Sequence, residues 1–262
     1  MKKIAVLSGI FLILIVTSCF AEQVKNSFGK ASLPDSSVYE GNFKNGLFNG
    51  KGTLTWRNGS KYEGEFKDGL MHGKGIFIGI NGDRYDGEIK DGLADGKGIN
   101  VWRNGGRYEG EFKDGYPNGK GVLTRRDGIR YEGEFKDGII EGKGVFTYPD
   151  GSKSEGEFKN DAYDGYTVIT RPGGYRFEGP IKNNMPNGKG KLALPNGDRY
   201  EGDFLNNLYE GRGVFIKANG DKYEGEFASG KFHGDGIYAY SPTGKKKGKV
   251  VKGRWLNGKY VK

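Results

Sequence analysis

Carboxylates and lysines recur along this chain at a fixed spacing, and they are the first residue types to consider as candidates for chemistry. Glu63 and Glu65 stand two residues apart, and Lys67 and Lys74 follow them. A general acid and a general base need unequal, partly buried environments, so such a pair is normally unique in a chain. The same types return here at Glu109, Glu111, Glu132, Glu134, Lys113 and Lys120. We therefore interpret them as cross-strand charge ladders.

Three other features lack the context that their chemistry requires. Residues 225–231 have the glycine and lysine spacing of a phosphate-binding loop, but no serine or threonine follows the lysine. His72 and His233 are the only histidines and lie far apart, which disfavours a histidine metal site. Cys19 is the only cysteine, which excludes an internal disulfide or a cysteine zinc cluster. The sequence therefore predicts no catalytic residue, no metal site, no cofactor and no enzyme.

The composition indicates a thin structure. Of 262 residues, 34% are hydrophobic, 13% are aromatic and 49 are glycine. So many aromatic residues argue against a disordered chain, while the shortage of aliphatic residues argues against a thick core. The net charge of +9 is concentrated from Lys245 onward, where eight basic residues and no acidic residue occur. This distribution argues against a nucleic-acid partner, because basic residues are not spread along the repeated part.

A period of 23 residues organises the chain, which is the pattern of an array of identical supersecondary units. Nine repeats begin, without insertion, at Tyr39, Tyr62, Tyr85, Tyr108, Tyr131, Ser154, Phe177, Tyr200 and Tyr223. We number the positions of each repeat 1 to 23 from this residue. In residues 62–67, aromatic residues and glycine alternate with charges, which predicts a strand with one dry face. A second strand from about residue 73 to residue 78 completes a β-hairpin.

Glycine and asparagine or aspartate mark both turns of the repeat. Asp68-Gly69 and Asn58-Gly59 represent the two turn sites, and such pairs favour type I′ turns, in which both central residues have positive φ. Where the first turn lacks glycine it has Asp161, Asn184 or Asn207, which also tolerate this backbone. Glycine never varies at positions 3 and 12. We expect large neighbouring side chains to lie over a bare backbone at both positions, rather than positive φ alone to require glycine there.

The pattern resembles the MORN (membrane occupation and recognition nexus) repeat. Tyr62-Glu63-Gly64-Glu65-Phe66, Gly69 and Gly73-Lys74-Gly75 match the motif of that family. The resemblance implies an all-β fold, an elongated single-layer antiparallel sheet or open solenoid of about nine to ten stacked 23-residue β-hairpins. Nine repeats would fill residues 39–246, and residues 247–262 would hold a partial tenth repeat and a basic C-terminal cap. Repeat six departs most, with Ser154 and Tyr166-Thr167, so we expect a local distortion, bend or partner-facing irregularity there.

The N-terminal segment reads as an export signal. Two lysines precede an apolar run from Ile4 to Val16, which is typical of a secretory signal peptide over residues 1–18. Residues 16–19 resemble the bacterial lipobox, which predicts lipidation of Cys19, and residues 19–38 would then be a tether. Cleavage after Ala21 and an uncleaved anchor are the alternatives. The leading prediction is an exported outer-membrane lipoprotein of the cell envelope, and the alternative is a periplasmic or secreted protein.

The leading hypothesis for function is a non-enzymatic scaffold at the bacterial envelope. One layer cannot easily cover an aromatic face, so we expect that face to bind a protein partner or a second copy of the chain. The predicted binding residues are Tyr62, Phe66, Tyr85, Tyr108, Phe112, Tyr131 and Phe135. Two alternatives are a polysaccharide binder using Trp56 and Trp102, and an anionic-lipid binder using the basic end. The basic end comprises Lys245, Lys246, Lys247 and Lys249, which we expect to cap the sheet edge.

Overall fold

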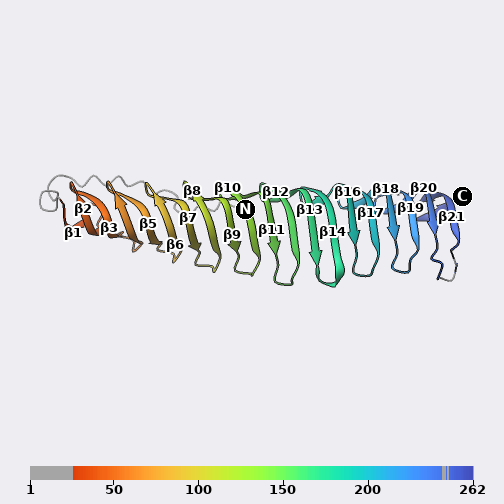
Figure 1. The fold of residues 1–262 in the computed structure, drawn as a ribbon, viewed down its shortest axis with the longest axis horizontal. Coiled ribbons are helices and arrows are strands. Elements are labelled where there is room, and N and C mark those ends of the chain that lie inside the picture. The colour runs from red at the N-terminus through yellow and green to blue at the C-terminus, as the bar shows by residue number, and fades with distance from the viewer. Residues whose placement is uncertain (1–25, 244–245, 247, 262) are drawn as a thin grey trace. The chain divides into compact units, whose positions relative to one another are not determined.

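The computed structural model describes residues 26–243, 246 and 248–261. These residues form 22 β-strands and one 3-10 turn, Pro172–Gly174, and they contain no α-helix. The chain divides into two compact units, Met1–Ile140 and Glu141–Lys262. In each unit the strands follow one another side by side in chain order, joined by tight turns (Figure 1). The prediction of an all-β fold built from stacked antiparallel hairpins is confirmed.

The first unit is an antiparallel sheet in which each strand pairs with the next along the chain. Its strands are β1 (Phe28–Ser32), β2 (Val38–Lys44), β3 (Leu47–Thr55), β4 (Lys61–Lys67), β5 (Leu70–Ile78), β6 (Arg84–Lys90), β7 (Leu93–Val101), β8 (Arg107–Lys113), β9 (Tyr116–Thr124) and β10 (Arg130–Lys136).

The second unit repeats this arrangement, and its first strand begins two residues before the boundary. Its strands are β11 (Ile139–Thr147), β12 (Lys153–Lys159), β13 (Ala162–Arg171), β14 (Tyr175–Lys182), β15 (Met185–Pro186), β16 (Gly188–Ala193), β17 (Arg199–Leu205), β18 (Leu208–Ile216), β19 (Lys222–Ala228), β20 (Lys231–Ala239), β21 (Val250–Leu256) and β22 (Lys259–Val261). β14 pairs with both β15 and β16, because Asn187 interrupts what would be one second strand.

The two turns of each repeat differ in backbone conformation. In the first turn both central residues have positive φ, 49° at Asp68 and 87° at Gly69, as the type I′ prediction requires. In the second turn only the glycine does, with φ of 91° at Gly59. That turn is longer, because the Trp56 N–H donates to the Ser60 carbonyl and the Gly59 N–H donates to the Trp56 carbonyl. The type I′ prediction is therefore wrong for the second turn, where asparagine instead accepts a hydrogen bond two residues on, from the Ser60 N–H.

Positions 3 and 12 require glycine for different reasons. At position 12, φ is positive in all nine repeats, for example 69° at Gly73, so the backbone conformation requires glycine there in addition to the nearby Glu65 side chain. The positive φ belongs to a β-bulge, since the pairing register shifts between Gly64 and Phe66. At position 3 the packing explanation holds. A Cβ added to Gly64 would lie 2.6 Å from the Cα of Gly75, and it would also overlap the Tyr62 hydroxyl.

The position-1 tyrosine covers a pair of facing glycines and completes the bulge. Gly64 and Gly75 are cross-strand partners, and the Tyr62 ring lies over both. Its hydroxyl donates to the Glu65 carbonyl at 3.0 Å, an acceptor beside the bulge. The same bond, from position 1 to the carbonyl at position 4, recurs at Tyr39, Tyr85, Tyr108, Tyr131, Tyr200 and Tyr223. Tyrosine therefore supplies both a ring and a donor that the repeat needs.

Aromatic rings interlock from one repeat to the next. Phe66 packs edge-on against Tyr62 of its own repeat, with centroids 5.1 Å apart, and against Tyr39 of the preceding repeat at 5.0 Å. Phe135 does the same with Tyr131 and Tyr108. Edge-to-face pairs at this spacing are favourable beyond the area they bury. The rings thus cover each other and the glycine backbone, so that a single layer buries its own aromatic face.

A strand precedes the first predicted repeat. β1 lies within residues 19–38, where the sequence predicted a tether, and it pairs with β2 from Phe28↔Asn42 to Ser32↔Val38. The tether prediction is therefore wrong for these five residues. They occupy positions 13–17 of an earlier repeat, with Gly29 at position 14, and Leu33 at position 18 is buried. The aromatic position-1 residue and most glycines of that repeat are lacking, which is why the motif did not reveal it.

A candidate binding surface on the polar face

The seven aromatic residues predicted to bind a partner are core residues. Tyr62 and Tyr108 have no exposed surface, and Phe66 and Phe112 are 4% exposed. Tyr85, Tyr131 and Phe135 are also buried. The prediction of an exposed aromatic face is therefore wrong for these residues, because each ring is covered by glycine backbone and by rings of neighbouring repeats. Burial also raises the pKa of Tyr39 and of Tyr223 to about 12, since the ionised phenol loses its water.

The opposite face of the sheet, which we call the polar face, carries the charged residues. Alternation along each first strand places positions 2 and 4 there, and along each second strand positions 13, 15 and 17. Position 2 is acidic and position 13 is mostly lysine. Position 15 is aliphatic in most repeats and partly exposed, and these side chains alternate across the strands with the carboxylates of position 2, as Ile99 does with Asp86 and Glu109. We call them the aliphatic row, which comprises Ile76, Ile99 and Val122 in the first unit, and Val145, Val168, Val214 and Ile237 in the second.

Ion pairs on the polar face run mainly along one strand. Arg107 reaches Glu109 at 2.7 Å, and Arg130 reaches Glu132 at 2.7 Å, two residues on. The same spacing recurs at Lys61–Glu63, Arg84–Asp86, Arg176–Glu178 and Lys222–Glu224. The predicted cross-strand pairing is found at Lys30–Glu40 and Lys191–Glu201. The carboxylates of these pairs lie in line with the aliphatic residues, because each position-2 residue is a cross-strand partner of position 15, as Glu109 is of Ile99 and Val122.

Each unit has a groove on this face. In the first unit a groove of about 780 Å³ lies over β1 to β6, and its lining includes Glu63, Lys74 and Ile76. In the second unit a groove of about 810 Å³ lies over β18 to β21, and its lining includes Val214 and Ile237. Both grooves combine carboxylates, ammonium groups and aliphatic side chains, with paired glycines in their floors. Such a surface suits a partner segment that offers both apolar and charged side chains.

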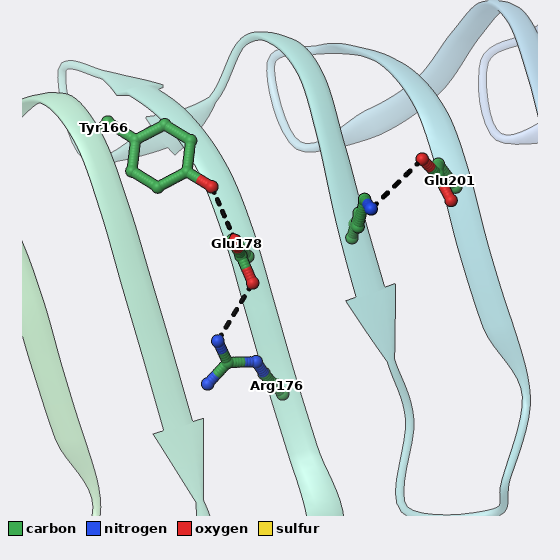
Figure 2. A network of polar contacts seen from close by, with 5 residues as sticks. Tyr166, Arg176, Glu178 and Glu201 are labelled. Carbon is green, nitrogen blue, oxygen red and sulfur yellow. Dashed lines mark hydrogen bonds and ion pairs between the residues drawn. The ribbon is translucent and has the colours of Figure 1, made fainter.

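The polar face is irregular at repeats six and seven (Figure 2). Tyr166 stands where most other repeats have lysine, is 55% exposed, and donates a hydrogen bond to Glu178 at 2.7 Å. Arg176 donates to the same carboxylate at 2.9 Å. These two bonds, that of Tyr166 first, hold the pKa of Glu178 below its usual range. Lys191 replaces the aliphatic residue of the next repeat and pairs with Glu201 at 3.3 Å.

The irregularity expected at repeat six is therefore found in side chains rather than in the register. Ser154 is buried where other repeats have a large ring, and Thr167 fills the space with no exposed surface. Gly156 faces Thr167, and the same bulge follows as in the regular repeats. A small residue at position 1 thus makes room for a side chain at position 14, and the pairing register of the two strands is unchanged.

The two histidines do not lie together as metal ligands would, and Trp56 and Trp102 are not fully exposed as a sugar-binding surface would require. His72 lies 3.5 Å from Asp91, from its Nδ1 to the carboxylate, and His233 lies on another strand in the other unit. Over the described residues, no cluster of three or more histidine, cysteine or acidic side chains is arranged to hold a metal ion. Trp56 is only 9% exposed and packs against Phe77, so it is not the exposed sugar-stacking surface that the polysaccharide hypothesis needs. Trp102 is half-buried.

The basic end lies in a turn rather than at the sheet edge. Lys246 and Lys249 fall between β20 and β21, and two further strand segments follow them. The Lys246 ammonium donates to the Tyr240 hydroxyl at 2.9 Å and sits 4.3 Å from the centre of its ring. The prediction that these lysines cap the edge is therefore wrong for Lys246 and Lys249, because β22 is the last strand. Lys245, Lys247 and Cys19 lie outside the described residues.

Membrane-spanning helices are not found among the described residues.

Sequence reasoning missed the aliphatic row, because it took the dry face from the first strand alone. The signal was present in the second strand, where Lys74, Ile76 and Ile78 alternate with Gly75 and Phe77. That alternation places isoleucines on the same face as the lysine.

Comparisons with known proteins identify the repeat. The family model described as the MORN repeat matches residues 39–61, 62–84, 85–107, 108–130, 131–153, 155–174, 177–199, 200–222 and 223–243. None of the curated proteins matches the chain. Among solved structures, the chain is similar to the TCP10 domain of Danio rerio CPAP, with 13% identity, a TM-score of 0.44, and coverage of 87% of this chain and 100% of that one.

A second similar structure is the TCP domain of Drosophila melanogaster SAS-4 in complex with a proline-rich motif of Ana2. It has 15% identity and a TM-score of 0.38, and the match covers 62% of this chain and 86% of that one. At such low identities and TM-scores these two likenesses say nothing about function.

Proposed function

This chain belongs to the MORN repeat family, and from that premise we propose that it is a non-enzymatic repeat scaffold of the bacterial cell envelope. Its polar face binds an extended segment of a protein partner. The observation that carries the proposal is the partial exposure of the aliphatic row on the polar face. The aromatic side chains of the other face are buried in the protein's own core. Exposed apolar side chains arranged in a row favour protein contact.

The spacing of the aliphatic row indicates the form of the partner segment. Each repeat contributes two strands, so successive aliphatic residues such as Ile76 and Ile99 lie about 9.6 Å apart across the sheet. A polyproline II helix advances about 9.3 Å per three residues, and its backbone needs no strand partner. A segment in this conformation that crosses the strands would place an apolar side chain on each repeat if every third residue were apolar. Its remaining residues would meet the carboxylates that lie between the aliphatic residues, such as Asp86 between Ile76 and Ile99, and the lysines of position 13.

A designed peptide tests this proposal directly. Its leucines recur at every third position, separated by lysine and proline, and a control peptide of the same composition has a scrambled order in which the leucines do not recur at every third position. We expect fluorescence anisotropy to show binding of the period-three peptide and weaker binding of the control. Replacing both Ile76 and Ile99 by serine should weaken binding by about tenfold or more, because two apolar contacts are lost.

The matched control for these substitutions is Ile80→Ser. Ile80 is 72% exposed and lies in the turn after β5, off the aliphatic row. Its replacement should leave binding of the peptide unchanged. Equal binding of the two peptides, or an equal loss with Ile80→Ser, would contradict binding along the row.

The proposal of an envelope location depends on the N-terminal sequence pattern. Lipidation of Cys19 would anchor the scaffold, while cleavage after Ala21 would release it and an uncleaved leader would hold it by the apolar run. Fractionation of the native host expressing Cys19→Ser, with mass spectrometry of the mature N-terminus, distinguishes the three. A wild-type N-terminus at unmodified Glu22 would contradict the lipid anchor. Binding of anionic lipid at the basic end stays a prediction, which liposome binding would test.

A further inference from the structure

The first strand of the described chain is half of a hairpin. β1 pairs with β2 on one side, and no described residue pairs with its other side. Its five residues correspond to positions 13–17 of a repeat, the part of a second strand that follows the bulge glycine. In complete repeats such as the second, this part pairs with the first strand of the same repeat on its other side, as Gly75 does with Gly64. Among the described residues, β1 therefore has an open edge on the side where a complete repeat has its first strand.

The last hairpin of the described chain lacks the matching part. β21 holds position 23 of repeat nine at Val250, followed by positions 1–6 of a tenth repeat. β22 covers only its end, with Leu256 paired to Lys259 and Arg254 to Val261. Val250–Gly253 pair with β20 on one side, and no described residue pairs with their other side. The side chain of Val250 is 59% exposed at this open edge.

The two open edges are complementary in register. β22 supplies positions 9–11 of a second strand, and β1 supplies positions 13–17. We propose that β1 of one copy of the chain pairs with the open part of β21 of another copy and so completes the tenth hairpin between them. The register of the complete hairpins then places Gly29 opposite Gly253, Ala31 opposite Val251, and Ser32 opposite Val250. The glycine pair of positions 3 and 14 is thereby kept across the junction.

The residues at the junction fit this pairing in shape and leave one electrostatic conflict. Phe28 is 67% exposed and falls beside Arg254, where a cation can lie over its ring. Backbone pairing along an open edge supplies most of the contact, as in the addition of a strand to a sheet. Lys30, however, faces Lys252, where other repeats oppose an acidic and a mostly aliphatic residue. Glu40 lies 3.4 Å from Lys30 on its other side and offsets part of this repulsion.

A contact of this kind joins unlike ends of two copies. Each added copy presents the same open edge again, so the assembly is not limited to two chains. We expect the mean mass of the full chain in light scattering to rise with protein concentration. Added salt should raise it further, because salt screens the two opposed lysines. A single monomer mass across concentration and salt would overturn the proposal.

Disulfide trapping tests the register itself. In full chains that also carry Cys19→Ser, one preparation carries Ser32→Cys and another Val250→Cys. Oxidation of the mixture should give a covalent dimer of the two variants, because facing residues on paired strands bring their Cβ atoms within bonding reach. The control mixture replaces Val250→Cys by Val251→Cys, whose side chain points to the opposite face, and should give little dimer. Equal trapping in the two mixtures, or none in the first, would overturn the pairing.

Charge reversal tests the one conflict. Lys252→Glu should tighten self-association by about three- to tenfold, because it replaces two opposed like charges by an ion pair. The matched control is Lys259→Glu on β22, which makes the same change away from Lys30 and should alter the affinity by less than about twofold. Equal effects of the two substitutions would overturn the contact. Ile76→Ser with Ile99→Ser leaves both edges intact, so failure of peptide binding and failure of self-association are separate results.

Discussion

Tyrosine fills position 1 in every repeat that begins in the first unit, whereas the second unit begins with serine and phenylalanine there. Ser154 and Phe177 are followed by Tyr200 and Tyr223, which restore the regular pattern. Despite this difference, the hairpins of both units share the same turn and bulge. The comparison shows that the register does not depend on the tyrosine of any one repeat, but on residues that adopt positive φ in the first turn and on glycine at the bulge.

The exceptions show what each part of the tyrosine does. Ser154 has neither ring nor phenol, and Thr167 takes the volume that the ring occupies elsewhere. Phe177 keeps the ring and lacks the hydroxyl. In its repeat the position-4 carbonyl, that of Pro180, accepts a hydrogen bond from the Asn187 N–H at 3.0 Å. Ring volume and the hydroxyl donor are therefore two separate contributions of the tyrosine, and repeat seven keeps its register with the ring alone.

Deleting part of a repeat should break the first unit more severely than any point substitution. Removal of residues 108–130 takes out one whole repeat and leaves its neighbours in phase, so we expect a folded chain with a modestly lower unfolding midpoint. Removal of residues 108–119 takes out about half a repeat and turns every following side chain to the wrong partner or face. Circular dichroism and thermal melting compare the two. Equal folding of both deletions would contradict the hairpin repeat.

Introducing the serine and threonine of repeat six into repeat four should show that positions 1 and 14 are coupled in their effect on the free energy of unfolding. Gly121→Thr alone should cost about 3 kcal/mol, because its side chain would overlap the Tyr108 ring. Tyr108→Ser alone should cost about 3–5 kcal/mol through the cavity it leaves. The double variant should cost less than the sum by about 1–3 kcal/mol, since the threonine occupies that cavity. Urea unfolding measures all three free energies.

The reverse exchange in the second unit is the control. Ser154→Tyr should be strongly destabilising alone and should be rescued by Thr167→Gly, which restores the regular glycine. Additive effects in either unit would contradict the account of Thr167 as a replacement for the ring.

Both units should lose stability at alkaline pH, because each holds buried position-1 tyrosines whose pKa is raised. Burial raises the pKa to about 12 at Tyr39 in the first unit and at Tyr223 in the second. An unfolded tyrosine releases its proton near pH 10, so stability is fully present below about pH 10 and falls as the pH rises toward 12. Each such group contributes a slope of up to about 1.4 kcal/mol per pH unit in that range.

Urea unfolding between pH 9 and pH 12, with Tyr39→Phe and Tyr223→Phe, measures these slopes. Each variant should lose stability less steeply than the wild type. A pH dependence confined to one unit would contradict equal burial.

The tyrosine hydroxyl should stabilise the first unit, whereas adding a hydroxyl at Phe177 should leave the free energy of unfolding nearly unchanged. Tyr108→Phe removes the donor to the Glu111 carbonyl, a bond of 2.9 Å, and should cost about 1 kcal/mol. Phe177→Tyr should change the free energy of unfolding by less than about 0.5 kcal/mol, because the Pro180 carbonyl already has its partner. A stabilisation by Phe177→Tyr as large as the loss at Tyr108 would show that the Asn187 bond does not replace the hydroxyl.

The fold could be predicted from the sequence because the same local pattern recurs in successive repeats. Alternation in residues 62–67 and the Asp68-Gly69 turn predict a hairpin, and exact recurrence at 23 residues predicts the stack. It was not sufficient for β1, whose repeat retains Gly29 but has lost its aromatic residue. It also misjudged the second turn, because Asn-Gly serves two turn types that differ in length and hydrogen bonding.

The binding surface was the harder inference, because exposure is decided between repeats. Whether Tyr39 is covered depends partly on Phe66 of the next repeat, and the pattern within one repeat does not contain that information. Residue types alone favoured an exposed aromatic face. The interlocking rings reverse that expectation and leave the aliphatic row, represented by Ile76, as the apolar surface that is available.

The smallest effect we predict concerns the carboxylate at the irregular part of the second unit. Glu178 accepts hydrogen bonds from Tyr166 and Arg176, whereas Glu109 in the first unit is paired with Arg107. The pKa of Glu178 is held low first by the Tyr166 hydroxyl and then by the guanidinium. Tyr166→Phe should therefore raise the pKa of Glu178 toward its ordinary value, and by more than Arg176→Gln does. Because the folded pKa is depressed, the associated stability is present above the unfolded pKa and is lost as pH falls through the folded one. Carboxyl NMR titration of the two variants measures both shifts, and a larger rise with Arg176→Gln would show that the ion pair, rather than the tyrosine, controls this site.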